Sequence, residues 1–190
     1  MYTPQHPYLT PEEYLALEAD SQVRHEYIDG YAYAMAGGSK AHNLISLNIA
    51  VELRAQLTAP CQTFMADMKV MARENARYYY PDVVVSCDDS NDLNGDRIEL
   101  PVLIVEVLPE STESFDRGDK FHDYSRLPSL QAYLLVSSRS YVVDCFQRTT
   151  NSQWLVCTHV GLQSIIQIEC LNLTLSLADI YATVNLSPGQ

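Results

Sequence analysis

A carboxylate stands inside an apolar run at PVLIVEVL, residues 101–108. The run of Val, Leu and Ile is typical of a buried strand, yet Glu106 lies within it, where an unpaired charge is costly. A second acid, Asp82, follows Pro81 in YYYPDVVVS and precedes a run of valines. If the two strands lie side by side, the two acids converge.

Two convergent carboxylates repel each other and require a cation or a shared proton. A hard divalent cation with oxygen ligands meets this need, and Mg²⁺ typically takes one or two carboxylates while it keeps several waters. Asp82 and Glu106 therefore suggest an Mg²⁺ site in which Mn²⁺ could substitute. The alternative for either acid is structural, because an acid at a strand end often pairs with an arginine or caps the backbone.

A lysine follows in FDRGDKFHDY, and it is one of only three lysines in the chain. Asp116, Lys120 and Tyr124 recur at four-residue spacing, so they share one face of the expected helix. One interpretation is a solvated Asp–Lys pair, which spacing alone favours. In the other, Lys120 points toward the two acids, where it could orient or help deprotonate a water and stabilise charge on a phosphate.

The elements that would position these residues begin with LTPEEYLAL, a helix for which Thr10 and Glu13 form a capping box. RHEYIDGYAYAMA alternates around Asp29 and Gly30, which predicts a hairpin. A second helix is expected between Ser39 and Pro60.

The chain then becomes rich in predicted strands: CQTFM, KVMA, RYYYPDVVVSC and PVLIVEVL. A short helix is expected around STESFDRGDKFHDYSRL. QAYLLVSS, SYVVDCFQR, WLVCTHV and SIIQIEC follow and suggest an antiparallel meander, and LTLSLADIYATV suggests a brief closing helix. DDSNDLNGD is a polar loop by composition, because its acids lack the offsets of a calcium loop.

Composition favours one domain, residues 1–190, with 19% charged residues and a net charge of −12. That charge argues against a large, non-specific nucleic-acid-binding face. No apolar stretch approaches the roughly 20 residues of a membrane helix, and no basic leader opens the chain. Five scattered cysteines suggest buried, reduced thiols and a cytoplasmic protein without membrane partners.

At this point the motifs resemble a known family. PD at 81–82, EVL at 106–108, the D-x-x-x-K-x-x-x-Y pattern from Asp116 and LQAYLLV at 130–136 are similar to the Uma2 family, within the PD-(D/E)xK restriction-endonuclease-like superfamily. HEYIDGYAYAMAGGSKAH is similar to that family's early segment, and the resemblance runs from about residue 8 to 181. It implies an α/β (α+β) fold: a restriction-endonuclease-like mixed central sheet flanked by helices, with additional antiparallel hairpins.

The resemblance also implies an Mg²⁺-dependent phosphodiesterase site. Carried over residue by residue, Asp82 and Glu106 would be metal ligands together with the backbone carbonyl of Val107, and Glu26 would be an additional catalytic acid. Without the family, Glu26 is better interpreted as an exposed strand acid paired with Arg24.

The superfamily's usual lysine comes two residues after the second acid, where this chain has Leu108. A leucine can neither hold a proton nor bind phosphate. In Uma2 proteins the lysine's role moves to the following helix, which implies that Lys120 is catalytic.

Three further residues are candidates to contact the metal ligands without binding the metal themselves: His42, Asp67 and Tyr124. Each has a simpler interpretation: a hydrogen-bonded core histidine, a turn residue and a helix-face residue. The tyrosines at 78–80 could stack on a base, but packing is favoured.

Three functional hypotheses follow. The first is a metal-dependent nuclease acting on nucleic acid, with DNA favoured, as a homodimer in which SYVVDCFQR supplies an edge or face. The second is a catalytically inactive interaction or regulatory module on the same fold, which Leu108 and the acidic balance favour. The third is a hydrolase of small phosphodiesters. Fold alone does not choose among them.

Overall fold

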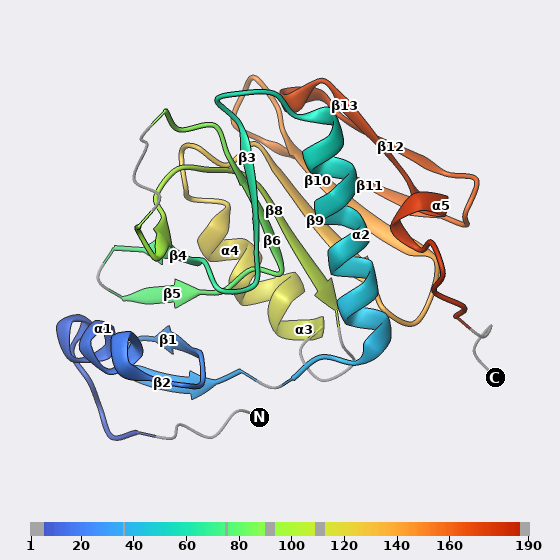
Figure 1. The fold of residues 1–190 in the computed structure, drawn as a ribbon. Helices are drawn as coiled ribbons and strands as arrows, with labels where there is room; N and C mark the ends of the chain where they lie inside the picture. Colours follow the sequence, from blue (N-terminus) through green and yellow to red (C-terminus); the bar gives the residue numbers. More distant parts are fainter. Residues whose placement is uncertain (1–5, 36, 75, 90–93, 109–112, 187–190) are drawn as a thin grey trace.

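The computed structural model describes residues 6–35, 37–74, 76–89, 94–108 and 113–186 (Figure 1). Its main element is a six-stranded sheet. In spatial order the strands are β11 (Trp154–Val160), β10 (Val142–Arg148), β9 (Ala132–Ser137), β8 (Pro101–Leu108), β6 (Val83–Ser86) and β3 (Gln62–Met65). β8 pairs parallel with β9 and antiparallel with β6, so the sheet is mixed, as the family resemblance implies.

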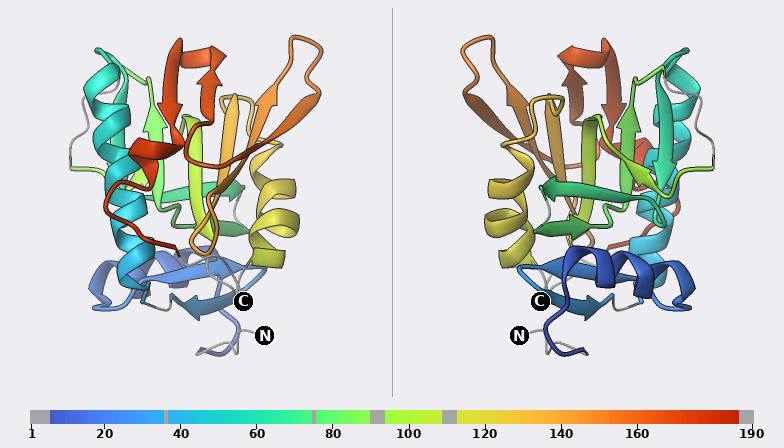
Figure 2. Two further views of the ribbon diagram at one scale, coloured as in Figure 1. Left: turned by 90° about the vertical axis from the view of Figure 1, so that its right-hand side faces the viewer. Right: turned by 90° about the vertical axis from the view of Figure 1, so that its left-hand side faces the viewer.

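Helices cover both faces of this sheet, which Figure 2 shows nearly edge-on. α2 (Lys40–Gln56) lies on one face, and α4 (Phe121–Tyr124) lies on the other. The pattern of burial follows the alternation of side chains along a strand. Val83 and Val85 join the core under α2, whereas Val84 between them joins the core on the α4 side. Both faces are buried, which explains the continuous apolar runs of β6 and β8.

Two smaller sheets complete the fold. The first has the order β2 (Tyr31–Ala34), β1 (His25–Ile28), β5 (Arg77–Tyr79), β4 (Lys69–Arg73) and β7 (Arg97–Ile98). The second pairs β12 (Ile165–Ile168) with β13 (Leu173–Ser176). The predicted meander is therefore correct for β9, β10 and β11 but wrong for SIIQIEC, whose strand pairs with β13 instead.

The remaining helices agree with the expected positions. α1 (Pro11–Asp20) begins with the predicted capping box of Thr10 and Glu13, and Ser39 caps α2. The helix expected around residues 111–127 is built from α3 (Glu113–Phe115), a π-helical turn η1 (Asp116–Lys120) and α4. η2 (Glu169–Leu171) is a 3₁₀ turn, and α5 (Leu177–Ile180) is the predicted closing helix. No helix in the described ranges is long and apolar enough to cross a membrane.

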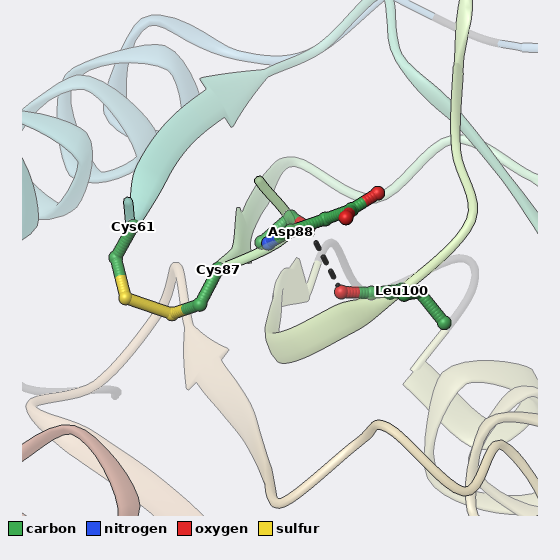
Figure 3. Close-up of a disulfide and its surroundings, with 5 residues drawn as sticks. Cys61, Cys87, Asp88 and Leu100 are labelled. Atoms are coloured by element: carbon green, nitrogen blue, oxygen red, sulfur yellow. Dashed lines mark hydrogen bonds between the residues drawn. A yellow bond between two sulfur atoms is a disulfide. The ribbon is translucent and has the colours of Figure 1, made fainter. Parts of the chain in front are cut away.

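The prediction of reduced cysteines is wrong for two of them, because Cys61 and Cys87 form a disulfide (Figure 3). They flank β3 and β6, in which Gln62 is the partner of Ser86, so the next residues outward meet at the end of the pair. Cys145 is buried, as expected, but Cys157 and Cys170 are exposed. The cysteines therefore do not support a cytoplasmic location.

Candidate active site

β6 and β8 bring the two predicted acids together. Val83 is the partner of Val105 in this antiparallel pair, so Asp82 and Glu106 come next on the same face. Asp82 Oδ2 accepts a hydrogen bond from the Val107 N–H at 2.7 Å, which fixes the carboxylate against β8. The convergence expected from the sequence is therefore present.

Lys120 lies at the centre of a buried carboxylate cluster and is only 6% exposed. Its Nζ is 2.8 Å from Glu26 Oε1, 3.2 Å from Asp116 Oδ1 and 3.3 Å from Glu106 Oε1. The Asp–Lys pair that spacing favours on a solvated surface does form, but it is buried and shared with two more acids. We call Glu26, Glu106, Asp116 and Lys120 the lysine cluster.

The lysine cluster draws its members from three parts of the chain. Glu26 is on β1 of the second sheet, Glu106 is on β8, and Asp116 and Lys120 are the first and last residues of η1. A π-helical turn has a wider ring than an α-helix and is frequent at functional sites. The second sheet thus closes over the cluster and buries it against the main sheet.

The structure shows whether Glu26 and Asp67 lie in the lysine cluster or at the surface. Glu26 is buried in the lysine cluster, so the interpretation as an exposed acid paired with Arg24 is wrong. Arg24 pairs instead with Asp67 at 3.5 Å, and the Asp67 side chain is 75% exposed. The structure therefore does not bring Asp67 into the cluster.

Tyr124 and His42 contact the two predicted metal ligands. The Tyr124 hydroxyl donates to Glu106 Oε1 at 3.3 Å from a fully buried position. His42, in the first turn of α2, places Nε2 3.2 Å from Asp82 Oδ1. His42 is thus a half-buried histidine that pairs with an acid, and its role in supporting a metal ligand stays a prediction. The Asp82 hydrogen bond raises the pKa of His42 against the opposing effect of burial, and the Val107 carbonyl adds to the rise.

The charges in the lysine cluster are strongly interdependent. Burial raises the pKa of Glu106 well above its ordinary value; Lys120 opposes the rise, while Asp116 and Asp82 add to it. Burial alone would lower the pKa of Lys120, but Glu106, Glu26 and Asp116 together raise it well above its ordinary value. The neighbouring acids therefore favour the charged form of Lys120.

This region fits a divalent cation on two grounds. Its four carboxyl groups (Glu26, Asp82, Glu106 and Asp116) outnumber the two side chains beside them that can carry a positive charge, Lys120 and His42. Glu26 Oε1 also makes no hydrogen bond within the described residues, although it lies in ion-pair distance of Lys120. An excess of buried negative charge of this kind is relieved by a cation or by protons.

The donor set suits a cation that keeps much of its water. Among the described residues, no group of three or more His, Cys, Asp or Glu side chains is arranged to hold a metal ion. The set implied by the sequence has only two carboxylates, Asp82 and Glu106, and the Val107 carbonyl. Mg²⁺ is commonly bound in this way, through one or two carboxylates.

Sequence reasoning missed a buried network behind the cluster, centred on Glu18 of α1. Glu18 Oε1 accepts from the His25 backbone N–H at 3.0 Å and from the Tyr80 hydroxyl at 3.2 Å, while Oε2 lies 3.2 Å from His25 Nδ1. His25 precedes Glu26, and Tyr80 lies two residues before Asp82. Glu18 therefore ties together the segments that carry two of the predicted site residues. The signal in the sequence was Glu18 four residues after Tyr14, on the buried face of α1.

The tyrosines at 78–80 are all buried, so packing is the correct interpretation and none is available to stack on a base. The Tyr79 hydroxyl donates to Asp123 at 2.7 Å.

A surface hollow lies at the disulfide end of β3 and β6. Its lining residues include Gln62, Phe64 and Asp96 but no member of the lysine cluster. It is therefore a different surface from the candidate active site.

Comparisons with known proteins identify the family of this chain. The model of the Uma2 family, described as "Putative restriction endonuclease", matches residues 11–178. The "Uncharacterized protein slr1290" of Synechocystis sp. is 39% identical over 173 residues, which are 90% of each chain. A second Synechocystis protein, "Uncharacterized protein sll1609", is 31% identical over 87% of this chain and 95% of its own length.

A similar fold has been solved. The crystal structure of a "putative nuclease belonging to DUF820" from Anabaena variabilis superposes with a TM-score of 0.75, at 15% identity, over 92% of this chain and 98% of that one. At this identity the likeness concerns the fold alone. The family match, which covers most of the chain, shows that the chain belongs to the Uma2 family.

Proposed function

We propose that this protein is a metal-dependent nuclease that hydrolyses phosphodiester bonds of nucleic acid, with DNA the favoured substrate and Mg²⁺ the cofactor. The observation that carries the proposal is the lysine cluster beside Asp82: a buried ammonium group among acids at the ends of two paired strands. The match to a family described as "Putative restriction endonuclease" supports hydrolysis of phosphodiester bonds as the reaction.

Asp82, Glu106 and the Val107 carbonyl would hold the cation. When bound, Mg²⁺ supplies Lewis-acid activation of water and neutralisation of phosphate charge. The chain itself contributes position and charge. His42 and the Val107 N–H orient Asp82, and Tyr124 orients Glu106. Lys120, whose charged form the neighbouring acids favour, would orient a water or stabilise charge that develops on the phosphate oxygens.

The protein would contact its nucleic-acid substrate only around the candidate active site and not through a broad basic face, because a net charge of −12 repels phosphates over the rest of the surface.

We further propose a homodimer, since cleavage of both strands of a duplex is commonly achieved by pairing two sites. A nucleic-acid substrate also favours a cytoplasmic location, although the Cys61–Cys87 disulfide removes the cysteine argument for it.

The second candidate function is a catalytically inactive module. Leu108 favours it, because this leucine is 3% exposed and packs in the core on the α4 side at the superfamily's usual lysine position. In that case the lysine cluster would serve only the fold.

A cleavage assay distinguishes the two functions. Supercoiled plasmid, linear duplex and single-stranded DNA would be incubated with the full chain and Mg²⁺ or Mn²⁺. We expect cleavage by the wild type and by Asp67→Asn, an exposed control acid, and loss of cleavage in Glu106→Gln. A wild type that binds metal yet leaves every substrate intact would support the inactive module.

A further inference from the structure

β11 forms the outer edge of the main sheet. It pairs with β10 over its whole length, and no strand of the described residues lies on its other side. The β10–β11 hairpin projects from the body of the molecule in both views of Figure 2, in orange. The suggestion that SYVVDCFQR supplies an edge is therefore corrected, because its strand, β10, lies between β9 and β11.

The backbone of β11 presents hydrogen-bonding groups outward. The Thr149 N–H donates to Gln153 O at 2.7 Å, and the Gly161 N–H donates to Tyr141 O at 2.8 Å. Because hydrogen-bonding direction alternates along a strand, odd-numbered residues between these positions face β10. Val156 and Thr158 therefore direct their N–H and C=O groups away from the sheet, where another strand could pair with them.

The side chains of β11 lack the features that normally protect an edge strand. Residues 154–160 contain no Pro, Lys, Asp or Glu, which are the usual means of blocking edge-to-edge association. Instead, Leu155 is 57%, Val156 49% and Val160 65% exposed. Leu162 and Ile165 beyond the strand are exposed as well. Because side chains alternate along a strand, Val156 and Val160 lie on one face of the sheet and Leu155 on the other, so both faces of this edge expose apolar side chains.

The distribution of charge favours a second copy of this chain as the partner. Two molecules of net charge −12 repel each other over most of their surfaces. Residues 145–168 contain no Asp or Glu, and β11 lies within them. Asp144, at the border of this stretch, is neutralised by its ion pair with Arg117. Two such molecules can therefore approach each other at β11 with little charge repulsion.

We propose that β11 pairs antiparallel with β11 of a second copy across a two-fold axis at Cys157. Val156 and Thr158, which face outward, lie symmetrically about this residue, so each would hydrogen-bond with the other on the partner strand. Cys157 would then face the partner's Cys157 in a non-hydrogen-bonded pair, where Cα atoms are about 4.5 Å apart. That separation is within the range of a disulfide.

The pairing would join the main sheets of two copies into one continuous sheet, an isologous interface. This inference deepens the proposed dimeric nuclease. Its tests measure self-association and not cleavage, so either proposal can fail without the other. Cleavage of single-stranded DNA by a monomer would, for example, retain the nuclease and exclude the interface.

The first test is the oligomeric state of the full chain by sedimentation velocity over a range of micromolar concentrations. We expect a dimer for the wild type and for Cys157→Ser. Cys157→Asp places two like charges directly opposite each other, so we expect its dimer dissociation constant to rise by at least about tenfold. Val51→Asp adds the same charge at an exposed site of α2 and should leave the dimer unchanged.

The second test is the register. Mild oxidation with diamide, which takes up the hydrogens of two thiols as the disulfide forms, should cross-link the wild type and Cys170→Ser but not Cys157→Ser. Urea unfolding of each variant confirms that the fold is kept. A monomeric wild type, a dimer indifferent to Cys157→Asp, or a cross-link that depends on Cys170 would each overturn the proposal. So would a monomer that binds an extended peptide of another protein along β11.

Discussion

Lys120 Nζ lies 2.8 Å from Glu26 Oε1, and this ion pair joins the π-helical turn after β8 to a strand of the second sheet. Because both side chains are buried, the contact holds the second sheet over the ends of β6 and β8. Glu106 and Asp116 share the same ammonium group. The fold and the candidate active site therefore depend on one lysine.

Replacing that lysine should destabilise the protein strongly. Lys120→Met keeps the length of the side chain but leaves three buried carboxylates without their cation, a change that typically costs about 3–5 kcal/mol. Urea unfolding followed by circular dichroism would measure the loss. Lys40→Met, at the exposed first residue of α2, is the matched control and should change stability by less than about 0.5 kcal/mol. Equal stability of the two variants would show that the cluster is not coupled to the fold.

His42 should make stability depend on pH. Its pKa is raised in the folded state, so the folded protein binds the imidazole proton more tightly than the unfolded chain. The resulting stabilisation is fully present below the unfolded pKa of about 6.5 and is lost as pH rises through the folded value. The difference in unfolding free energy between wild type and His42→Asn should therefore shrink from pH 5.5 toward pH 9, in about the range where histidine titrates. A difference that stays constant would mean that the Asp82 contact does not involve the charged imidazole.

Glu18 should matter for stability despite its distance from any predicted ligand. Glu18→Ala leaves the His25 N–H and the Tyr80 hydroxyl without their buried acceptor, which we expect to cost about 2–3 kcal/mol. Glu18→Gln retains an acceptor oxygen and should recover part of the loss. Glu12→Ala, an exposed change in the first turn of the same helix, serves as the control. If Glu18→Ala is no worse than Glu12→Ala in urea, the network does not hold these segments together.

The disulfide should contribute to stability without affecting the metal site. It joins the far ends of β3 and β6, at the opposite end of β6 from Asp82, and closes a loop with a sequence separation of 26 residues. Removing it typically costs about 2–4 kcal/mol. We expect Cys61→Ser/Cys87→Ser to unfold at lower urea concentration but to bind Mn²⁺ as the wild type does. Impaired metal binding in a folded double variant would contradict the separation of the two regions.

The sequence predicted those parts of the site that depend on local pattern. Apolar runs around Asp82 and Glu106 defined two buried strands, and their acids met because the strands are neighbours. Four-residue spacing placed Asp116, Lys120 and Tyr124 on one helix face, but spacing does not say whether that face is solvated.

The remaining features depend on tertiary structure. Glu26 is buried because a second sheet folds over the first, which nothing near Glu26 in the sequence reveals. Cys61 and Cys87 meet through the register of β3 and β6. The strand in SIIQIEC was recognisable, yet alternation along a strand does not specify its partner.

Metal binding by calorimetry tests the central claim most directly, namely that Asp82 and Glu106 form one Mg²⁺ site. Mg²⁺ and Mn²⁺ would be titrated into the wild type, Asp82→Asn, Glu106→Gln and the exposed control Asp67→Asn. We predict binding by the wild type and the control, and loss of binding in both site variants. A wild type that binds neither cation, or binding that survives both substitutions, would contradict the account and leave Glu106 as a structural partner of Lys120.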